Sequence, residues 1–506
     1  MVTSSLRRAA VCGVLGLACR SAEADTDAVD TTAASSVASS DTVATTGQPE
    51  PSTTSPPTTT AGEATAPGEA TTDEGNTDSS TGEPVPTAWT PSFLAREFVC
   101  KLISDTGLDD PTDNHTHTRF NLRGTDLGIP ALVASRLLLF FGDTVGYRVI
   151  WDFGEDPDAV ATIDAAAAIA DPAVMCNALD FYVTGDVPSV AAGVDPSIER
   201  DFAGAAMTPP AGQSITEYIA QPAGPFDFLP GTFEVPTGAL GQDDAAWLFY
   251  AGLVETQPRY RATRNYLARW SDPVAAPAPA YQIIRPIDDL VDGALGGHFI
   301  QVAPVAHDDE VWLFGTGDYR RSGVYVARLD RDALESGEGT ALFDPTQPPA
   351  SAWVDAASLD AAAKAAIAPS FETDGVGELS VVWLDDPGLL VAMYQRELHD
   401  AGGNITDNRI VLRTAPGPQG PWSDAVTVVD MADPEFTAAH CCGTTCEGAQ
   451  ILHCFVAGLY GAYLLPLASV SPGPGGSLEL DLPFVVSTWD PYNVVLMRTQ
   501  ISLAPV

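Results

Sequence analysis

The chain has 506 residues, with 24 lysines and arginines against 67 aspartates and glutamates, and a formal net charge of -43 at pH 7. Such an acidic surface repels nucleic acid and anionic lipid, which excludes both as the main partner. The length allows one large folded domain or two of medium size, and the charge suits an exported protein that acts on something neutral.

Residues 1–19 have the pattern of an export signal. Arg7 and Arg8 precede a short apolar stretch, which is too short to span a bilayer as a helix. The stretch ends in Leu15-Gly-Leu-Ala-Cys19 and resembles a bacterial lipobox, although Gly16 stands where a leucine is usual. We predict that Cys19 carries the lipid and that the protein is a cell-surface lipoprotein, with simple secretion as the alternative. Membrane contact is expected only through this anchor.

Residues 20–87 are rich in serine, threonine, alanine, proline and acidic residues, with almost no large apolar side chains. Such a segment cannot bury enough apolar surface to offset its conformational entropy. It is predicted to be a disordered tether between the anchor and a folded domain over residues 88–506.

From Trp89 onward the sequence predicts short strands separated by glycine, proline and aspartate turns. One predicted hairpin joins residues 311–320 to 323–329, and two alanine-rich segments, Asp158–Ala170 and Leu359–Ala368, are expected to be short helical insertions. Five groups of apolar runs recur, at 137–141, 246–250, 310–314, 379–383 with 389–394, and 484–486 with 494–497. The pattern excludes a doubly wound sheet and leaves a sandwich, a barrel or a propeller. Five blades of roughly eighty residues would fill the domain, so we predict an all-β, five-bladed propeller.

The cysteines beyond the signal number an even six: Cys100, Cys176, Cys441, Cys442, Cys446 and Cys454. In an exported domain this count predicts three disulfides, whose pairing the sequence does not determine. The alternative is a metal site over residues 440–446 with 453–454, but its spacing fits no standard zinc pattern. We expect no metal and no cofactor.

Two aspartates lie on either side of the strand expected at 137–141. Asp126 stands between the glycines of Gly124-Thr-Asp-Leu-Gly128, and Asp143 follows directly in Gly142-Asp-Thr144. Two carboxyl groups held near one buried strand are what general acid/base catalysis on a glycoside requires. The alternative is that both aspartates only make hydrogen bonds within turns.

Eight motifs occur in the order found in one bacterial family. They are Gly124–Pro130, Phe140–Thr144, Phe299–Val305, Leu313–Gly317, Gly377–Ser380, Arg413–Ala415 with Gly420–Ser423, Tyr460–Tyr463 and Ser487–Val494. Together, over roughly residues 115–502, they resemble domain of unknown function 4185, part of which is classed as glycoside hydrolase family 183, the endo-D-arabinanases. The resemblance implies a five-bladed propeller with its active site at the mouth of the central channel. It also implies that Asp126 and Asp143 are catalytic and that the substrate is an α-linked D-arabinofuranose polymer.

Such a reaction needs one acid held protonated near neutral pH and a second carboxylate that activates water or attacks directly. The sequence does not say which aspartate is the acid, and inversion is only weakly preferred over retention. Glu378 is a third candidate carboxylate, with a solvent-facing strand position as its alternative. Further candidates for substrate binding are His298, Gln301, Arg320, Trp489, Asp490, Tyr492 and Asn493, for several of which core packing is an equal alternative. His115 and His117 have metal-like spacing but lack a third ligand.

The sequence therefore predicts a monomeric, exported glycoside hydrolase with a polysaccharide substrate, most simply an endo-D-arabinanase. One alternative is a hydrolase of another furanoside polysaccharide. The other is a non-catalytic glycan-binding or adhesion propeller, which would have no need for both aspartates.

Overall fold

The computed structural model describes residues 89–105, 111–146, 158–184, 201–202, 206–208, 233–256, 259–276, 278–290, 293–401, 404–434, 436, 458–489 and 491–506. The predictions for the export signal with Cys19, for the tether, for Cys441, Cys442, Cys446 and Cys454, and for Asp490 lie outside these residues. Among the helices within these ranges, none is long and apolar enough to cross a membrane.

The described residues form an all-β structure, as predicted. Four of its sheets follow one another along the chain. The first consists of β3 (Leu127–Val133), β4 (Arg136–Asp143), β6 (Asp158–Asp164) and β7 (Asp180–Phe181), and the second of β11 (Phe233–Gln242), β12 (Ala245–Thr256), β13 (Arg259–Trp270) and β14 (Ala280–Asp289), with β10 (Ala206–Thr208) parallel at its edge. The third consists of β15 (Gln301–His307), β16 (Glu310–Thr316), β17 (Tyr325–Asp330), β18 (Ala341–Phe343) and β19 (Trp353–Asp355), and the fourth of β20 (Val376–Leu384), β21 (Leu389–His399), β22 (Ile405–Ala415) and β23 (Val426–Asp430).

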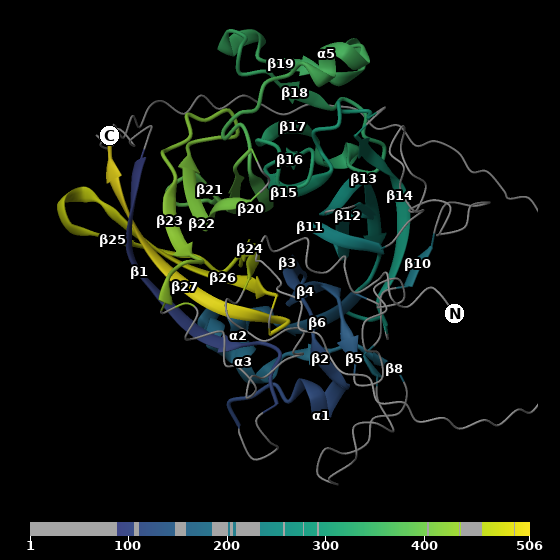
Figure 1. The fold of residues 1–506 in the computed structure, drawn as a ribbon, viewed down its shortest axis with the longest axis vertical. Helices are drawn as coiled ribbons and strands as arrows, with labels where there is room; N and C mark the ends of the chain where they lie inside the picture. The colour runs from purple at the N-terminus through teal and green to yellow at the C-terminus, as the bar shows by residue number, and fades with distance from the viewer. Residues whose placement is uncertain are drawn as a thin grey trace, which may run out of the picture. The chain divides into compact units, whose positions relative to one another are not determined.

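A further sheet joins the two ends of the described chain. Its strands are β24 (Leu459–Leu464), β26 (Leu478–Thr488), β27 (Asn493–Pro505) and β1 (Trp89–Lys101), and β25 (Ser469–Pro472) also pairs with β26. The N-terminal strand β1 is antiparallel to the C-terminal strand β27, with Trp89 opposite Pro505 (Figure 1). The sheet is therefore complete only when both ends of the chain are present.

Five strands, one from each of these sheets, contact one another in a cycle. These inner strands are β3, β11, β15, β20 and β24; each contacts its successor, and β24 contacts β3 again (Figure 1). A cavity of about 190 Å³ is lined by residues from all of them, among them Leu132, Gly238, Pro304, Val381 and Tyr463. The inner strands thus surround a common space.

In every sheet, the start of the inner strand and the end of its paired strand lie close together near the common space. Each inner strand is antiparallel to the strand that it pairs with in its own sheet, so the start of the inner strand lies beside the end of its partner. In β3 and β4, for example, Leu127 is opposite Phe141. Polar residues at these two positions of each sheet are therefore candidates for one shared site.

The helices are short. They are α1 (Thr116–Phe120), α2 (Ala165–Ala170), α3 (Met175–Ala178) and α5 (Ala361–Ala365). Cys176 of α3 forms a disulfide with Cys100 of β1. These are two of the six cysteines for which three disulfides were predicted. Two further sheets have two strands each. They are β2 (Leu122–Gly124) with β5 (Val145–Gly146), and β8 (Val183–Thr184) with β9 (Asp201–Phe202).

The predicted apolar runs all lie in strands, and the predicted hairpin is the β16–β17 pair. The prediction of a helix over Asp158–Ala170 is wrong in its first half. Asp158–Asp164 is strand β6, and only Ala165–Ala170 is helical, with the Asp164 side chain capping its N-terminus. Pairing with β4 on one side and β7 on the other overrides the helix propensity of the alanines in this stretch.

Candidate functional site

Asp126 lies immediately before β3, and its main chain and side chain are both held closely. Its carbonyl accepts a hydrogen bond from the Gly142 N–H (3.1 Å), and the next N–H, of Leu127, donates to Ser487 Oγ (2.7 Å). Leu127 has a φ of 65°, a conformation that non-glycine residues rarely adopt and that clusters at functional sites. A Cβ at Gly142 would lie 2.3 Å from Asp126 Oδ1, so only glycine allows this approach.

Asp143 is the last residue of β4, on the strand that pairs with β3. The threonines of the two motifs link the aspartates, since Thr125 Oγ1 and Thr144 Oγ1 are 2.8 Å apart and both are completely buried. Both hydroxyls also lie within hydrogen-bond distance of the Gly142 carbonyl. The sequence placed Asp126 and Asp143 on either side of one strand, and the structure adds that they are joined through this threonine pair.

Glu378 of β20 is the third predicted carboxylate. Its side chain is 5% exposed, which rules out the solvent-facing alternative. It accepts hydrogen bonds from Arg320 Nη2 (3.0 Å) and from the Tyr319 hydroxyl (2.9 Å). Burial alone would raise the pKa of Glu378, but the Arg320 charge and these hydrogen bonds outweigh it, and the pKa is lowered. Glu378 is therefore an ionised group.

Arg320 was predicted to contact substrate or an active-site carboxylate, and its described contacts are to carboxylates. Beyond Glu378, its Nη1 is 3.2 Å from Glu397 Oε2, and its guanidinium lies 4.7 Å from the Tyr319 ring centre. Arg320 itself has a φ of 55°. Glu397, on β21, also lies 3.1 Å from His399 Nε2. Arg320 thus bridges carboxylates from two neighbouring strands.

Tyr460, on β24, connects Asp126 to this group. Its hydroxyl donates to Asp126 Oδ2 (3.0 Å), and its ring centre is 5.7 Å from the Arg320 guanidinium carbon. Tyr492 also hydrogen-bonds Asp126, and it packs with Val145, Tyr460 and Trp489 in a small apolar cluster. The Trp489 and Tyr492 rings are 5.8 Å apart and nearly perpendicular. Two of the predicted aromatic residues therefore lie beside the aspartates.

Asp126 differs from Glu378 in its protonation. Burial, with a smaller contribution from the Glu378 charge, raises the pKa of Asp126 to about 7, although the hydrogen bonds from Tyr460 and Tyr492 oppose the rise. One buried carboxyl group thus keeps its proton up to neutral pH while another nearby is ionised. Such a separation of pKa values is characteristic of acid/base sites.

Three further residues predicted to bind substrate, Gln301, His298 and Asn493, make contacts of other kinds. Gln301 is buried at the start of β15, where its Oε1 accepts from Thr316 Oγ1 (3.3 Å). His298 stacks on Tyr325 at 3.8 Å, and its Nε2 is 3.2 Å from the Lys364 carbonyl. Both polar groups of the Asn493 side chain bond to the main chain of Ile103. The contacts described here for His298 and Asn493 do not include Asp126 or Asp143.

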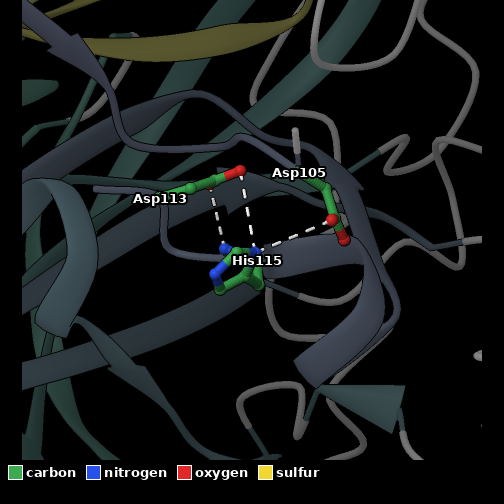
Figure 2. Close-up of side chains that lie close together, drawn as sticks. All are labelled: Asp105, Asp113 and His115. Carbon is green, nitrogen blue, oxygen red and sulfur yellow. Dashed lines mark hydrogen bonds and ion pairs between the residues drawn. The ribbon is translucent and has the colours of Figure 1, made fainter. Parts of the chain in front are cut away.

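His115, of the pair with metal-like spacing, lies beside two carboxylates (Figure 2). Its Nδ1 is 3.9 Å from Asp105 Oδ1 and 3.8 Å from Asp113 Oδ2. Each aspartate uses its other oxygen within the protein, Asp105 for the Thr118 N–H and Asp113 for the His115 N–H. This is the only group of three potential metal ligands within the described ranges, and His117 is not part of it. A protonated imidazole would satisfy both carboxylates equally well.

Sequence reasoning missed several residues of the site. Tyr460 was quoted only as part of a motif, and Tyr319, Glu397 and His399 carried no local signal. Asp158 and Glu234, which also face the aspartates, were missed as well. Asp158 was hidden because its segment was predicted to be a helix. Glu234 and Tyr460 lie near the start of an inner strand, and Glu397 lies near the end of the strand paired with β20. A search of these two positions in each sheet would have found all three.

Comparison with known proteins gives one match to a family model, over part of the chain. Residues 261–498 match the model of Domain of unknown function (DUF4185), which confirms for that segment the resemblance seen in the motifs. No curated protein matches the chain.

Several solved structures share a distant likeness. A provisionally assigned hydrolase of Bacteroides ovatus has 14% identity and a TM-score of 0.44, over 75% of this chain and 86% of that one. The Bacillus subtilis arabinanase Arb43A has 10% identity and a TM-score of 0.38, over 75% and 96%. A Bacteroides ovatus glycosyl hydrolase has 8% identity and a TM-score of 0.39, over 79% and 94%. At this level the likenesses say nothing about the activity of this chain.

Proposed function

We propose that this protein is a glycoside hydrolase that cleaves arabinofuranosidic linkages inside a polysaccharide, with Asp126 as the general acid. The observation that carries the proposal is the state of Asp126, a buried carboxyl group with a pKa of about 7. It is tied through Thr125 and Thr144 to the second motif aspartate. A glycosidase needs one protonated acid and one ionised carboxylate at the same pH.

In this proposal Asp126 protonates the leaving oxygen while Asp143 activates the water that attacks the anomeric carbon. Glu378 stays ionised through Arg320, and its charge helps to keep the proton on Asp126. Tyr460 fixes the orientation of the acid, and the partly exposed Trp489 offers an aromatic surface against which a sugar ring can rest. Inversion remains the weakly preferred outcome, and D-arabinan is the preferred substrate among furanosides.

The proposal includes a five-bladed propeller. Its support is the cyclic order of contacts among β3, β11, β15, β20 and β24, and the cavity they line. Each inner strand would be the first strand of a blade, and the acids would lie at one mouth of the central channel. Export with a lipid anchor at Cys19 is proposed from the sequence alone.

The test is kinetic. Asp126→Asn and Asp143→Asn should each reduce turnover on a furanoside polysaccharide by about a hundredfold to ten-thousandfold, with more if Asp143 attacks directly. Substrate affinity should change little, because the amide keeps the size of the carboxyl group. The measurement is product formation from a panel of arabinans and fructans, with the melting temperature of each variant as a folding check.

Asp289→Asn is the matched control, because Asp289 is a partly buried aspartate that forms an ion pair with Arg264 and has no role in the proposed reaction. It should retain parental turnover. Parental rates in both Asp126→Asn and Asp143→Asn would refute the assignment of the acid and base. A parent protein that binds arabinan without cleaving it would instead support the adhesion alternative.

A further inference from the structure

A third aspartate faces Asp126 and Asp143, and no step of the proposed reaction uses it. Asp158 is the first residue of β6, 7% exposed, and is the register partner of Asp143 on β4. Side chains of directly opposed residues in an antiparallel pair lie on the same face of the sheet, with Cβ atoms roughly 5 Å apart. Asp158 Oδ2 is fully buried and has no hydrogen-bond partner among the residues that the structure describes. A buried, unpaired carboxyl oxygen is costly and calls for a functional reason.

The position of Asp158 is set by the same threonine pair that links the other two aspartates. The N–H of Ala159, the next residue, donates to Thr144 Oγ1 (3.1 Å), and Thr144 Oγ1 lies 2.8 Å from Thr125 Oγ1. Each of these three residues is a direct neighbour in sequence of one aspartate. The chain Thr125–Thr144–Ala159 therefore fixes Asp126, Asp143 and Asp158 relative to one another.

The charges around Asp158 decide its protonation. Within the part of the chain that the structure describes, the titratable groups that interact with it are Asp126, Asp143 of β4, Glu234 of β11, Tyr250 of β12 and Tyr281 of β14. None of these is a cation. Burial, followed by the charges of Glu234, Asp143 and Asp126, raises the pKa of Asp158 well above its ordinary value. Several buried carboxyl groups this close cannot all be ionised, and the raised pKa of Asp158 favours its protonated form.

We propose that Asp158 is a positioning residue that remains a neutral carboxylic acid at the working pH and so allows Asp143 beside it to stay ionised. This role rests on the proposed hydrolase reaction. A neutral carboxyl group adds no negative charge next to the base, and it carries an O–H that can donate a hydrogen bond. An ionised Asp158 would instead repel Asp143 and favour its protonation, which would remove the base.

Asparagine and leucine at position 158 separate the possible roles, because an amide is neutral and donates hydrogen bonds while leucine has the size but no donor. Asp158→Asn should keep turnover within about tenfold of the parent, while Asp158→Leu should lose about a hundredfold or more. Across a pH series, the acid limb of the Asp158→Asn profile should match that of the parent. Loss in Asp158→Asn as deep as in Asp143→Asn would show that Asp158 works ionised and overturn the proposal. Parental turnover in Asp158→Leu would overturn it too.

A second measurement needs no substrate. An aspartate with a raised folded-state pKa binds more protons in the folded than in the unfolded state, so stability falls as pH rises between the two pKa values. Asp158→Asn removes this loss, and its melting temperature should gain on the parent as pH rises from about 4 toward neutral. Asp164→Asn, at the exposed other end of β6, is the control and should show no such gain, since asparagine also caps helix α2.

The two measurements keep separate the failure of this inference and the failure of the proposed function. An Asp158→Asn variant with no pH-dependent gain refutes the neutral acid, whether or not the protein hydrolyses any glycan. Absence of hydrolysis by the parent over the whole substrate panel refutes the positioning role together with the reaction, while the melting curves still decide the proton. If the parent hydrolyses a glycan but either Asp158 measurement fails, the proposed reaction is retained and only the proposed role of Asp158 is refuted.

Discussion

Asp126 and Glu378 are two buried carboxyl groups whose pKa values are moved in opposite directions by their neighbours. Glu378 has Arg320 and Tyr319 within 3.0 Å, whereas the hydrogen bonds of Asp126 come from the neutral hydroxyls of Tyr460 and Tyr492. Burial acts on both groups alike, so the difference comes from the cation. Replacing Tyr460 or Glu378, two neighbours of Asp126, should therefore alter the pH range in which Asp126 holds its proton.

This leads to opposite shifts for two substitutions. Activity that needs protonated Asp126 falls as pH rises through its pKa of about 7. Tyr460→Phe removes a hydrogen bond that lowers this pKa, so the alkaline limb of kcat/KM should move to higher pH. Glu378→Gln removes a charge that raises it, so the limb should move to lower pH. A shift of roughly half a unit to one unit is expected, and it is measured from pH profiles of kcat/KM.

Tyr325→Phe is the control for these profiles, because Tyr325 stacks on His298 and its described contacts do not include Asp126. Its alkaline limb should coincide with that of the parent. Shifts of the same sign in Tyr460→Phe and Glu378→Gln would contradict the assignment of the limb to Asp126.

At the scale of the elements, the hydroxyl pair Thr125–Thr144 connects the entry to β3, the end of β4 and the start of β6. Thr144→Val should lower the free energy of unfolding by about 1–3 kcal/mol, because it leaves the buried N–H of Ala159 without its acceptor. Thr125→Val should cost less, and the double variant should cost less than the sum of the two, since both lose the same 2.8 Å contact. Denaturant unfolding of the four proteins measures this coupling.

Thr162→Val, on β6 itself, is a sharp control. The Thr162 hydroxyl is buried and has no hydrogen-bond partner within the described ranges, so replacing it by a methyl group should be neutral or stabilising. Additive effects of Thr125→Val and Thr144→Val would show that the two hydroxyls act independently.

The elements also explain what the sequence could and could not predict. Leu137–Phe141 was a clear strand because its side chains are apolar and buried on both faces. Asp158–Asp164 was mistaken for a helix because alanine favours helices locally, while the two neighbouring strands that decide its conformation are distant pairing partners. The aspartates were identified from their motifs, but the Arg320–Glu378–Glu397 bridge joins residues 58 and 77 positions apart, and no local pattern announces such contacts.

For the whole molecule, the strand β1 marks where the folded part has to begin. A protein beginning at Trp89 should keep the melting temperature and turnover of the full chain, because it retains all of β1. A protein beginning at Leu102 should melt at a lower temperature and aggregate, because β27 would become an unpaired edge strand. Thermal unfolding and size-exclusion chromatography measure both. Equal stability of the two shortened proteins, or insolubility of the first, would contradict this boundary.

The pairing of Trp89 with Pro505 has one more consequence. Directly opposed residues of two antiparallel strands have Cα atoms only about 5 Å apart, so a linker of a few residues could join the start of β1 to the end of β27. New termini could then be opened at the tight turn Asp308–Asp309 between β15 and β16, where Asp308 is exposed. The order of the sheets along the chain would change while every strand pairing stayed the same. The fold should therefore tolerate circular permutation, with the acids unaffected because Asp126, Asp143 and Glu378 all lie outside β15 and β16.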